Sequence, residues 1–251
     1  MLLVKIFRTI ITYFLVFAFL VLSIPAMIVT GCRAKKDRYA AARAAYPPIR
    51  AICSFLLFTS GVRMTVKGME HIPDDKPVLF VSNHRSYFDI VAALGRVPIA
   101  CGYMAKDTLA HFPLLSNWMR LLLCQFLARD DMKKDLEVVI ASIQQLKDGY
   151  SMWVCPEGTR GTSDDITQPS EFRQGAMKLA QKSGCLVIPV AITGTREVFE
   201  EKFPLISGGD VTMVFGEGFY ISDLEKEVQK ESGAYARRVI IDMLKQELIG
   251  A

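Results

Sequence analysis

The 251-residue sequence lacks the patterns that mark several common kinds of catalytic and metal site. It contains no Gly-x-Ser-x-Gly turn, which presents the serine nucleophile of many hydrolases. Its six cysteines show neither a Cys-x-x-Cys spacing nor a Cys/His pattern typical of metal ligands, so we expect no metal site. There is no internal repeat and no low-complexity segment. The chemistry of this chain must therefore rest on other residue types.

The cysteines themselves are expected to be reduced and packed as small hydrophobic side chains, because several lie inside apolar runs. Reduced thiols fit a domain that faces the cytosol. Cys155 lies next to a polar loop and could act as a nucleophile, but its place at the end of an apolar run favours a buried thiol.

Charge is absent from Ile10 to Thr30, a stretch long enough to cross the hydrocarbon core of about 30 Å as a helix. Pro25 should kink or end that helix. A basic cluster follows, whereas only Lys5 and Arg8 precede the run; the cluster comprises Arg33, Lys35, Lys36, Arg38 and Arg43. Either the segment spans with its downstream side in the cytoplasm, or a two-helix hairpin lies in one leaflet with its cations on anionic headgroups.

The remainder of the chain alternates between strand-like and helix-like segments. Apolar runs such as 77–81, 151–155 and 185–192 are typical of buried strands, and 172–183 and 235–248 have helical periodicity. This alternation predicts an α/β fold with a largely parallel sheet flanked by helices. We expect a membrane-anchoring helical segment over residues 1–60 and an α/β domain over 61–251.

The segment after the first of these runs contains a candidate base. His84 follows the strand directly, and Ser86 is placed to cap a helix in which Asp89 lies in the first turn. Imidazole accepts a proton near neutral pH, and a carboxylate on its other ring nitrogen fixes the tautomer. Alternatively, Asp89 only complements the helix dipole and His84 is a turn residue.

A second loop favours the functional interpretation. The run 151–155 ends in Pro156-Glu157-Gly158-Thr159-Arg160, which again delivers polar groups after a strand. Ligands bind at the carboxyl ends of strands in open α/β sheets, so the two loops can line one crevice. Lys106 and Arg129 also follow strand-like runs. Three cations near a histidine suit an anionic substrate such as a phosphate. Glu157 could bind a substrate hydroxyl or hold an arginine.

These blocks, in this order, resemble the glycerolipid acyltransferase family, in particular its 1-acyl-sn-glycerol-3-phosphate (lysophosphatidic acid) acyltransferases. The resemblance covers residues 61–218 and rests on four segments. They are Asn83-His84-Arg85-Ser86-Tyr87-Phe88-Asp89, Gln125-Phe126-Leu127-Ala128-Arg129, Pro156-Glu157-Gly158-Thr159-Arg160 and Val187-Ile188-Pro189-Val190. Two positions depart from the family pattern, since Gly161 stands where serine is usual and Arg173-Gln174 where two lysines are usual.

The resemblance implies transfer of an acyl chain from an acyl thioester to the sn-2 hydroxyl of 1-acyl-glycerol 3-phosphate, which gives phosphatidic acid. His84 would be the base oriented by Asp89, and Arg129 and Arg160 would belong to the phosphate pocket. The other expected substrate-binding residues are Asn83, Lys106, Glu157, Gly158 and Thr159. The co-substrate would be acyl-acyl carrier protein or acyl-coenzyme A, with no further cofactor and no nucleic-acid partner.

The resemblance also favours the in-leaflet hairpin, and places the protein at the cell membrane with its catalytic domain in the cytoplasm. Other acceptors remain open, namely glycerol 3-phosphate, a lysophospholipid or an aminolipid. A hydrolase or phosphatase that uses the same histidine is a further alternative, as is a membrane lipid-binding protein without catalysis. Intact His84, Asp89 and Glu157 argue against the last, because a binding protein needs no base paired with a carboxylate.

Overall fold

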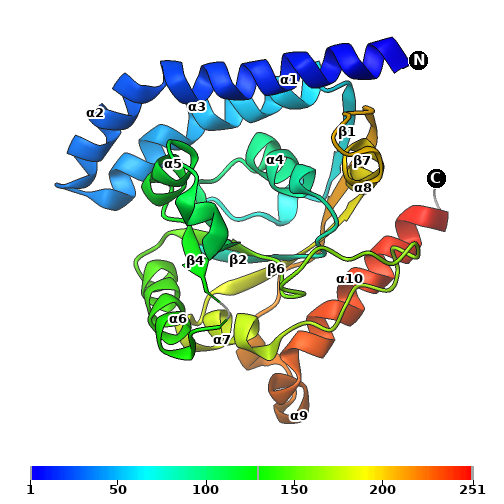
Figure 1. Cartoon of the computed structure of the whole chain (residues 1–251). Helices are drawn as coiled ribbons and strands as arrows, with labels where there is room; N and C mark the ends of the chain where they lie inside the picture. Colours follow the sequence, from blue (N-terminus) through cyan, green and yellow to red (C-terminus); the bar gives the residue numbers. More distant parts are fainter. Residues whose placement is uncertain (1, 129, 250–251) are drawn as a thin grey trace.

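The computed structural model describes residues 2–128 and 130–249, which form a seven-stranded sheet covered by helices on both faces (Figure 1). The strand order is β1-β7-β6-β2-β5-β3-β4. The strands β2 to β6 are parallel, whereas β1 and β7 are parallel to each other and β7 is antiparallel to β6. This confirms the expected α/β class with a largely parallel sheet. The strands are β1 (Val62–Lys67), β2 (Val78–Ser82), β3 (Cys101–Lys106), β4 (Gln125–Leu127), β5 (Ser151–Val154), β6 (Leu186–Thr193) and β7 (Gly209–Phe215).

The two faces of the sheet form two separate cores, because alternate side chains of a strand point to opposite sides. In the fully buried strand β2, Val78 and Phe80 belong to one core and Leu79 and Val81 to the other. The first face is covered by α3 (Arg38–Thr59), α4 (Tyr87–Arg96) and α5 (Leu115–Leu121). The second face is covered by α6 (Met132–Lys147), α7 (Gln174–Ser183) and α10 (Ser232–Ile249).

Three helices precede the sheet: α1 (Leu2–Leu22), α2 (Ile24–Ala34) and α3. The chain turns at Ser23, and Pro25 lies in the first turn of α2, where its missing N–H removes no helical hydrogen bond. The expectation that Pro25 ends the first helix is confirmed. Among the described helices, only α1 is long and apolar enough to cross a membrane by length and composition.

Helix α3 precedes residue 60, the expected domain boundary, and it packs against the sheet. Tyr46 and Leu57 of α3 are almost fully buried, and α3 packs along α4 and into the same core as the sheet. α3 differs from α1 in composition, because it carries Arg38, Arg43 and Arg50 beside its buried apolar side chains. α1 and α2 contribute only partly buried side chains to this core, namely Phe19, Leu20 and Met27.

Short elements complete the fold and were not expected from sequence. The helix α8 (Thr195–Val198) follows β6 directly, and a 3-10 turn at Glu200–Lys202 follows α8. Further short helical elements are η1 (Met69–His71), η2 (Asp107–His111), η4 (Ile221–Asp223) and α9 (Lys226–Lys230). The segment from Thr195 to Lys202 matters for the site, because it lies over the start of α4.

Candidate active site

The loop between β2 and α4 carries the histidine and aspartate predicted as the catalytic pair. Ser86 caps α4 through its side chain, and the Asp89 carboxylate accepts a hydrogen bond from the Ser86 N–H, which completes a capping box. The same Asp89 Oδ2 lies 2.8 Å from His84 Nδ1. One carboxylate therefore caps the helix and also contacts the histidine ring, so the two interpretations of Asp89 do not exclude each other, and its catalytic role stays a prediction.

The Asp89 carboxylate is held by more than the histidine. Its Oδ2 also accepts a hydrogen bond from the Arg85 N–H at 2.7 Å, and its Oδ1 accepts one from the Thr195 hydroxyl. Asp89 is 1% exposed. A buried carboxylate with these donors is fixed in one orientation, since any rotation would leave a donor unpaired. Sequence reasoning missed Thr195, which lies 106 positions away at the start of α8 and has no motif that marks it.

The contact with Asp89 determines the histidine tautomer. A carboxylate that accepts two main-chain N–H groups at the same oxygen presents only acceptor character, so His84 Nδ1 must carry the hydrogen. The other ring nitrogen, Nε2, is then the one able to accept a proton. The His84 side chain is 18% exposed, which leaves the ring accessible to a substrate.

Glu157 bridges the two loops through their main chains. Its Oε1 accepts the His84 N–H at 2.7 Å and its Oε2 accepts the Ser170 N–H at 2.8 Å. Burial raises the pKa of Glu157, and these two hydrogen bonds oppose that shift. The carboxylate therefore fixes the main chain of the loop that carries His84. No arginine of the described residues pairs with it, which was one of the two roles considered, and a contact with substrate stays a prediction.

Asn83 likewise fastens main chain. Its side-chain amide donates to the Ile192 carbonyl and its side-chain oxygen accepts from the Ile192 N–H, both at 2.9 Å. This side chain is buried and ties the end of β2 to β6. It serves the site by placing the next residue, His84, and its expected contact with substrate remains untested.

Arg160 is brought to the histidine loop by its neighbour. The Gly161 N–H donates to the His84 carbonyl at 2.8 Å, so the second loop is pinned beside the first. The Arg160 guanidinium lies 4.1 Å from the centre of the Tyr87 ring, and its Nη1 contacts Glu200 Oε1 at 3.0 Å. The expectation that the loops after β2 and β5 lie at one sheet edge is confirmed, because these strands are neighbours.

The other expected site residues are distributed along the same edge. Lys106 ends β3, which lies next to β5, and its side chain is exposed. Gly158 has a φ of 74°, and its N–H donates to the Cys155 carbonyl, so it shapes the turn and is not a free donor. Thr159 is exposed at the same turn. Arg129 lies outside the described residues.

The thiol of Cys155 is not suited to nucleophilic attack. Burial raises its pKa to about 12, and its Sγ lies 3.4 Å from the Ser82 hydroxyl at the root of the two loops. A thiolate is the reactive form of cysteine, and this environment suppresses it. The interpretation of Cys155 as a packed thiol is therefore confirmed.

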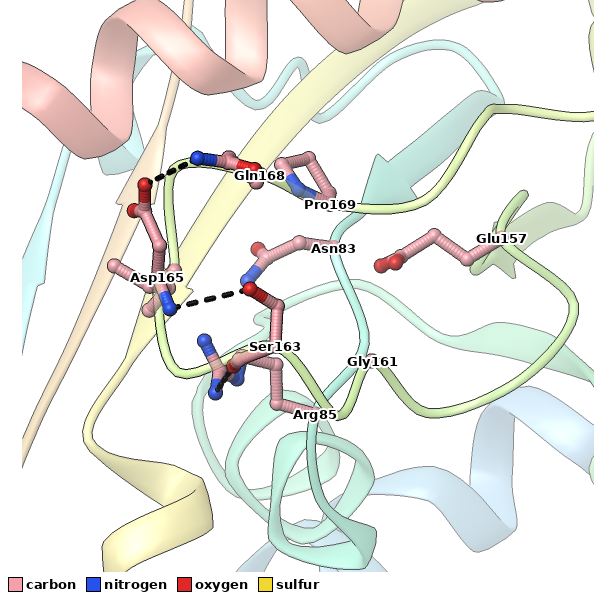
Figure 2. Close-up of a pocket in the computed structure, with 9 residues that line it drawn as sticks. Asn83, Arg85, Glu157, Gly161, Ser163, Asp165, Gln168 and Pro169 are labelled. Atoms are coloured by element: carbon pink, nitrogen blue, oxygen red, sulfur yellow. Dashed lines mark hydrogen bonds between the residues drawn. The ribbon is translucent and has the colours of Figure 1, made fainter.

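Two cavities adjoin the loops. Figure 2 shows the smaller one, about 10 Å³, between the His84 loop and the segment 161–169, with Asn83 and Glu157 on its wall. That volume holds about one water molecule and no lipid. A second cavity of about 180 Å³ lies at the ends of β3, β4 and β5 between α6 and α7, and Met104, Val154 and Leu179 make its lining mainly apolar.

The sequence and the fold of this chain are both similar to those of known proteins. A sequence profile of the Acyltransferase family matches residues 63–193, just over half of the chain, including both site loops. The chain belongs to the Acyltransferase family. The expectation drawn from the four sequence blocks is confirmed at this level.

Similar proteins include 1-acyl-sn-glycerol-3-phosphate acyltransferases from Saccharomyces cerevisiae and Borreliella burgdorferi. They are 28% identical over 188 residues and 27% identical over 168 residues, which cover 74% and 66% of this chain. The matched segments span 61% and 65% of those two relatives. The crystal structure of the 1-acyl-sn-glycerophosphate acyltransferase PlsC from Thermotoga maritima has the same fold, with a TM-score of 0.79, 24% identity and 96% of each chain covered.

Proposed function

We propose that this acyltransferase moves an acyl chain from an acyl thioester to the sn-2 hydroxyl of 1-acyl-glycerol 3-phosphate, with phosphatidic acid as product. The observation that carries the proposal is the His84 ring, fixed at Nδ1 by Asp89 with Nε2 left to accept a proton. The names of the relatives support the substrate, and an arginine beside the histidine suits its phosphate.

In this mechanism His84 Nε2 takes the proton of the sn-2 hydroxyl while its oxygen attacks the thioester carbonyl carbon. The Asp89 carboxylate stabilises the imidazolium that forms. The tetrahedral intermediate then expels the thiolate as the C–S bond breaks, and the imidazolium returns its proton to that sulfur. The donor is acyl-acyl carrier protein or acyl-coenzyme A, and the scheme draws on no metal or other cofactor.

The acyl chain needs apolar surroundings, whereas the oxyanion and the phosphate need hydrogen-bond donors and positive charge. The apolar cavity of about 180 Å³ adjoins Gly158 and can take part of an acyl chain. The tetrahedral oxyanion needs N–H donors, and those of Thr159 and Arg160 have no hydrogen-bond partner within the described residues. Arg160, with Arg129 and Lys106, supplies positive charge for the phosphate.

Membrane attachment is the second part of the proposal, and α1 is its carrier. One stripe of the helix exposes large apolar side chains at helical spacing: Leu3, Phe7, Ile10, Phe14 and Phe17, each at least 62% exposed. The opposite stripe is polar and joined to the domain. Arg8 donates to the Ser207 carbonyl, Thr9 accepts from the Ile206 N–H, and Thr12 contacts Ser60.

These contacts favour a helix that lies in one leaflet. Ser23, the residue after α1, accepts a hydrogen bond from Trp118 Nε1. Between the contacts of Arg8 and Ser23 the helix therefore runs along the domain for about 22 Å, at 1.5 Å per residue (Figure 1). A spanning helix could not keep these contacts unless the polar domain entered the bilayer. We place the exposed stripe in the cytoplasmic leaflet, where the basic residues after α1 meet anionic headgroups.

The decisive experiment for the reaction crosses acceptors with donors. Purified protein in detergent would be given 1-acyl-glycerol 3-phosphate, glycerol 3-phosphate, a lysophospholipid or an aminolipid, each with acyl-acyl carrier protein or acyl-coenzyme A. We expect phosphatidic acid from the first acceptor, and none with the His84→Ala protein. Faster turnover of another acceptor would replace the proposed substrate, and release of free fatty acid without any acceptor would indicate a hydrolase.

Membrane seating is tested by the double variant Phe14→Glu, Phe17→Glu, which changes only the exposed stripe. Flotation with vesicles of anionic lipid should fall sharply, whereas the melting temperature should change little because both side chains are exposed. Unchanged flotation would show that another surface binds the membrane.

A further inference from the structure

The Arg160 side chain is held by Tyr87 and Glu200, neither of which was expected to belong to the site. Tyr87, the first residue of α4, provides the ring beneath the guanidinium at 4.1 Å. Glu200, in the 3-10 turn after α8, contacts Nη1 at 3.0 Å. The two restraints come from elements separated by more than 100 residues of sequence, so only the folded chain brings them together.

Glu200 is itself fixed in place. Its Oε1 accepts the Tyr87 N–H at 2.8 Å as well as the Arg160 contact, and its side chain is 18% exposed. The N–H at the start of a helix has no partner within the helix, so this bond also stabilises α4. The second oxygen, Oε2, is buried without a hydrogen-bond partner among the described residues.

The geometry of the guanidinium shows what this arrangement leaves available. Glu200 occupies Nη1, at one corner, and Tyr87 occupies one face. The edge formed by Nε and Nη2 has no partner in the described part of the chain. This edge carries two parallel N–H donors, which match two oxygens of a phosphate. In the same protein, Arg63 uses that edge to bind both oxygens of Asp210 at 2.6 Å.

We infer that Glu200 is a positioning residue for the acceptor: it fixes Arg160 so that the Nε and Nη2 edge is presented to the phosphate beside His84. This rests on the proposed function, in which Arg160 binds the acceptor phosphate. The Gly161 contact with the His84 carbonyl sets the distance between the two groups, and Glu200 with Tyr87 sets the direction of the guanidinium. Glu200 thereby governs recognition of a phosphate-bearing acceptor and leaves the acyl donor unaffected.

If Glu200 and Arg160 formed only an ordinary surface ion pair, replacing Glu200 would lower the stability slightly and would change the KM of no particular substrate. The test is Glu200→Gln, which keeps the shape and removes the charge. We expect the KM for 1-acyl-glycerol 3-phosphate to rise about 3- to 10-fold, the effect of weakening one charge-assisted contact, with kcat and the donor KM unchanged. Transfer to 1-acylglycerol, which lacks the phosphate, should be unaffected.

The matched control is Glu201→Gln. Glu201 is the next residue of the same turn and lies 3.8 Å from Arg196 Nε, away from Arg160. It should leave all three parameters unchanged. In an Arg160→Ala background, Glu200→Gln should add no further rise in the acceptor KM, since the residue it positions is gone. If the glutamine variant unfolds, Glu200→Asp, which keeps the charge on a shorter side chain, should give a smaller rise in the same KM.

The outcomes separate this inference from the function on which it rests. An Arg160→Ala protein with an increased acceptor KM, beside a Glu200→Gln protein with an unchanged one, would overturn the inference alone. The same would follow if Glu200→Gln raised the acceptor KM equally in both backgrounds, or changed only kcat or the donor KM. An Arg160→Ala protein with an unchanged acceptor KM would overturn the phosphate role of Arg160, and the inference with it.

Discussion

The loops after β2 and β5 both carry site residues, but the structure holds them in different ways. In the β2 loop, Asp89 accepts hydrogen bonds from the His84 ring, from two main-chain N–H groups and from Thr195. In the β5 loop, the Arg160 side chain relies on one ion pair and one ring contact. Transfer of a proton requires a base placed within tenths of an ångström, whereas a charged side chain attracts a phosphate over a wider range.

Because the β2 loop carries the proposed base, a substitution in this loop should lower the rate of transfer more than one in the β5 loop. His84→Ala should lower kcat by about 10²–10⁴-fold, the usual contribution of a general base, while the circular dichroism spectrum stays native. Asp89→Asn should lose less, and the double variant little more than His84→Ala, because the two residues act as a unit. A folded His84→Ala protein that keeps a tenth of the rate would contradict the role of base.

Glu157 joins the two loops, so Glu157→Ala should affect both stability and rate. It leaves the N–H groups of His84 and Ser170 without an acceptor, and the free energy of unfolding should fall by about 1–3 kcal/mol or more. Chemical denaturation measures this change. Glu171→Ala, which removes an exposed carboxylate from the same loop, is the control and should be neutral.

The same variant has a consequence for pH dependence. Because burial raises the pKa of Glu157, the folded protein holds a proton that the unfolded chain releases at lower pH. The contribution of this group to stability is therefore greatest below the ordinary glutamate range and falls as pH rises through the raised value. Glu157→Ala should lack that decline, and an identical pH profile in both proteins would contradict the assignment.

Arg160→Lys should give a smaller effect, confined to one substrate. Lysine keeps the charge but loses the planar fork, so the KM for the phosphate-bearing acceptor should rise about tenfold with kcat nearly constant. Steady-state kinetics with each substrate varied in turn provides the measurement. A rise in the donor KM instead would assign this arginine to the phosphates of the acyl carrier.

The smallest effect is expected for chemical labelling at the ends of β2 and β5, where Ser82 contacts Cys155. With its pKa raised to about 12, Cys155 should not react with a thiol reagent at pH 8, whereas the exposed Cys32 should react at once. Labelling of the native protein followed by mass spectrometry distinguishes the two. Rapid labelling of Cys155 would show that the loops open at their base.

Sequence alone predicted the local part of the site. His84, Ser86 and Asp89 lie within one turn of chain at the start of a helix, and helix capping fixes their mutual geometry whatever surrounds them. The alternation of strand and helix likewise indicated the parallel sheet and the meeting of β2 and β5 at one edge. Strand β1 and helix α8 were not predicted. α8 has only four residues, whereas the six residues of β1 alternate between apolar and polar in a pattern that could have marked it.

The partners that come from distant positions could not be predicted. Thr195 reaches Asp89, and Glu200 reaches Arg160, only because β6 returns the chain beside β2 and α8 then turns over the start of α4. The sequence left two roles open for Glu157, and only the fold shows that its carboxylate accepts hydrogen bonds from the main-chain N–H groups of His84 and Ser170. A side chain's type states which bonds it can form, and only the packed fold states which partner is within reach.

The N-terminal helices show the same division. The uncharged run from Ile10 to Thr30 was plain in the sequence, as was the break at Pro25. Tertiary contacts decided that α3 belongs to the core and that α1 lies along the domain by its polar stripe. The physical reason is that burial in protein and burial in lipid select the same apolar residues, so the sequence determined which helices avoid water and the fold determined what covers them.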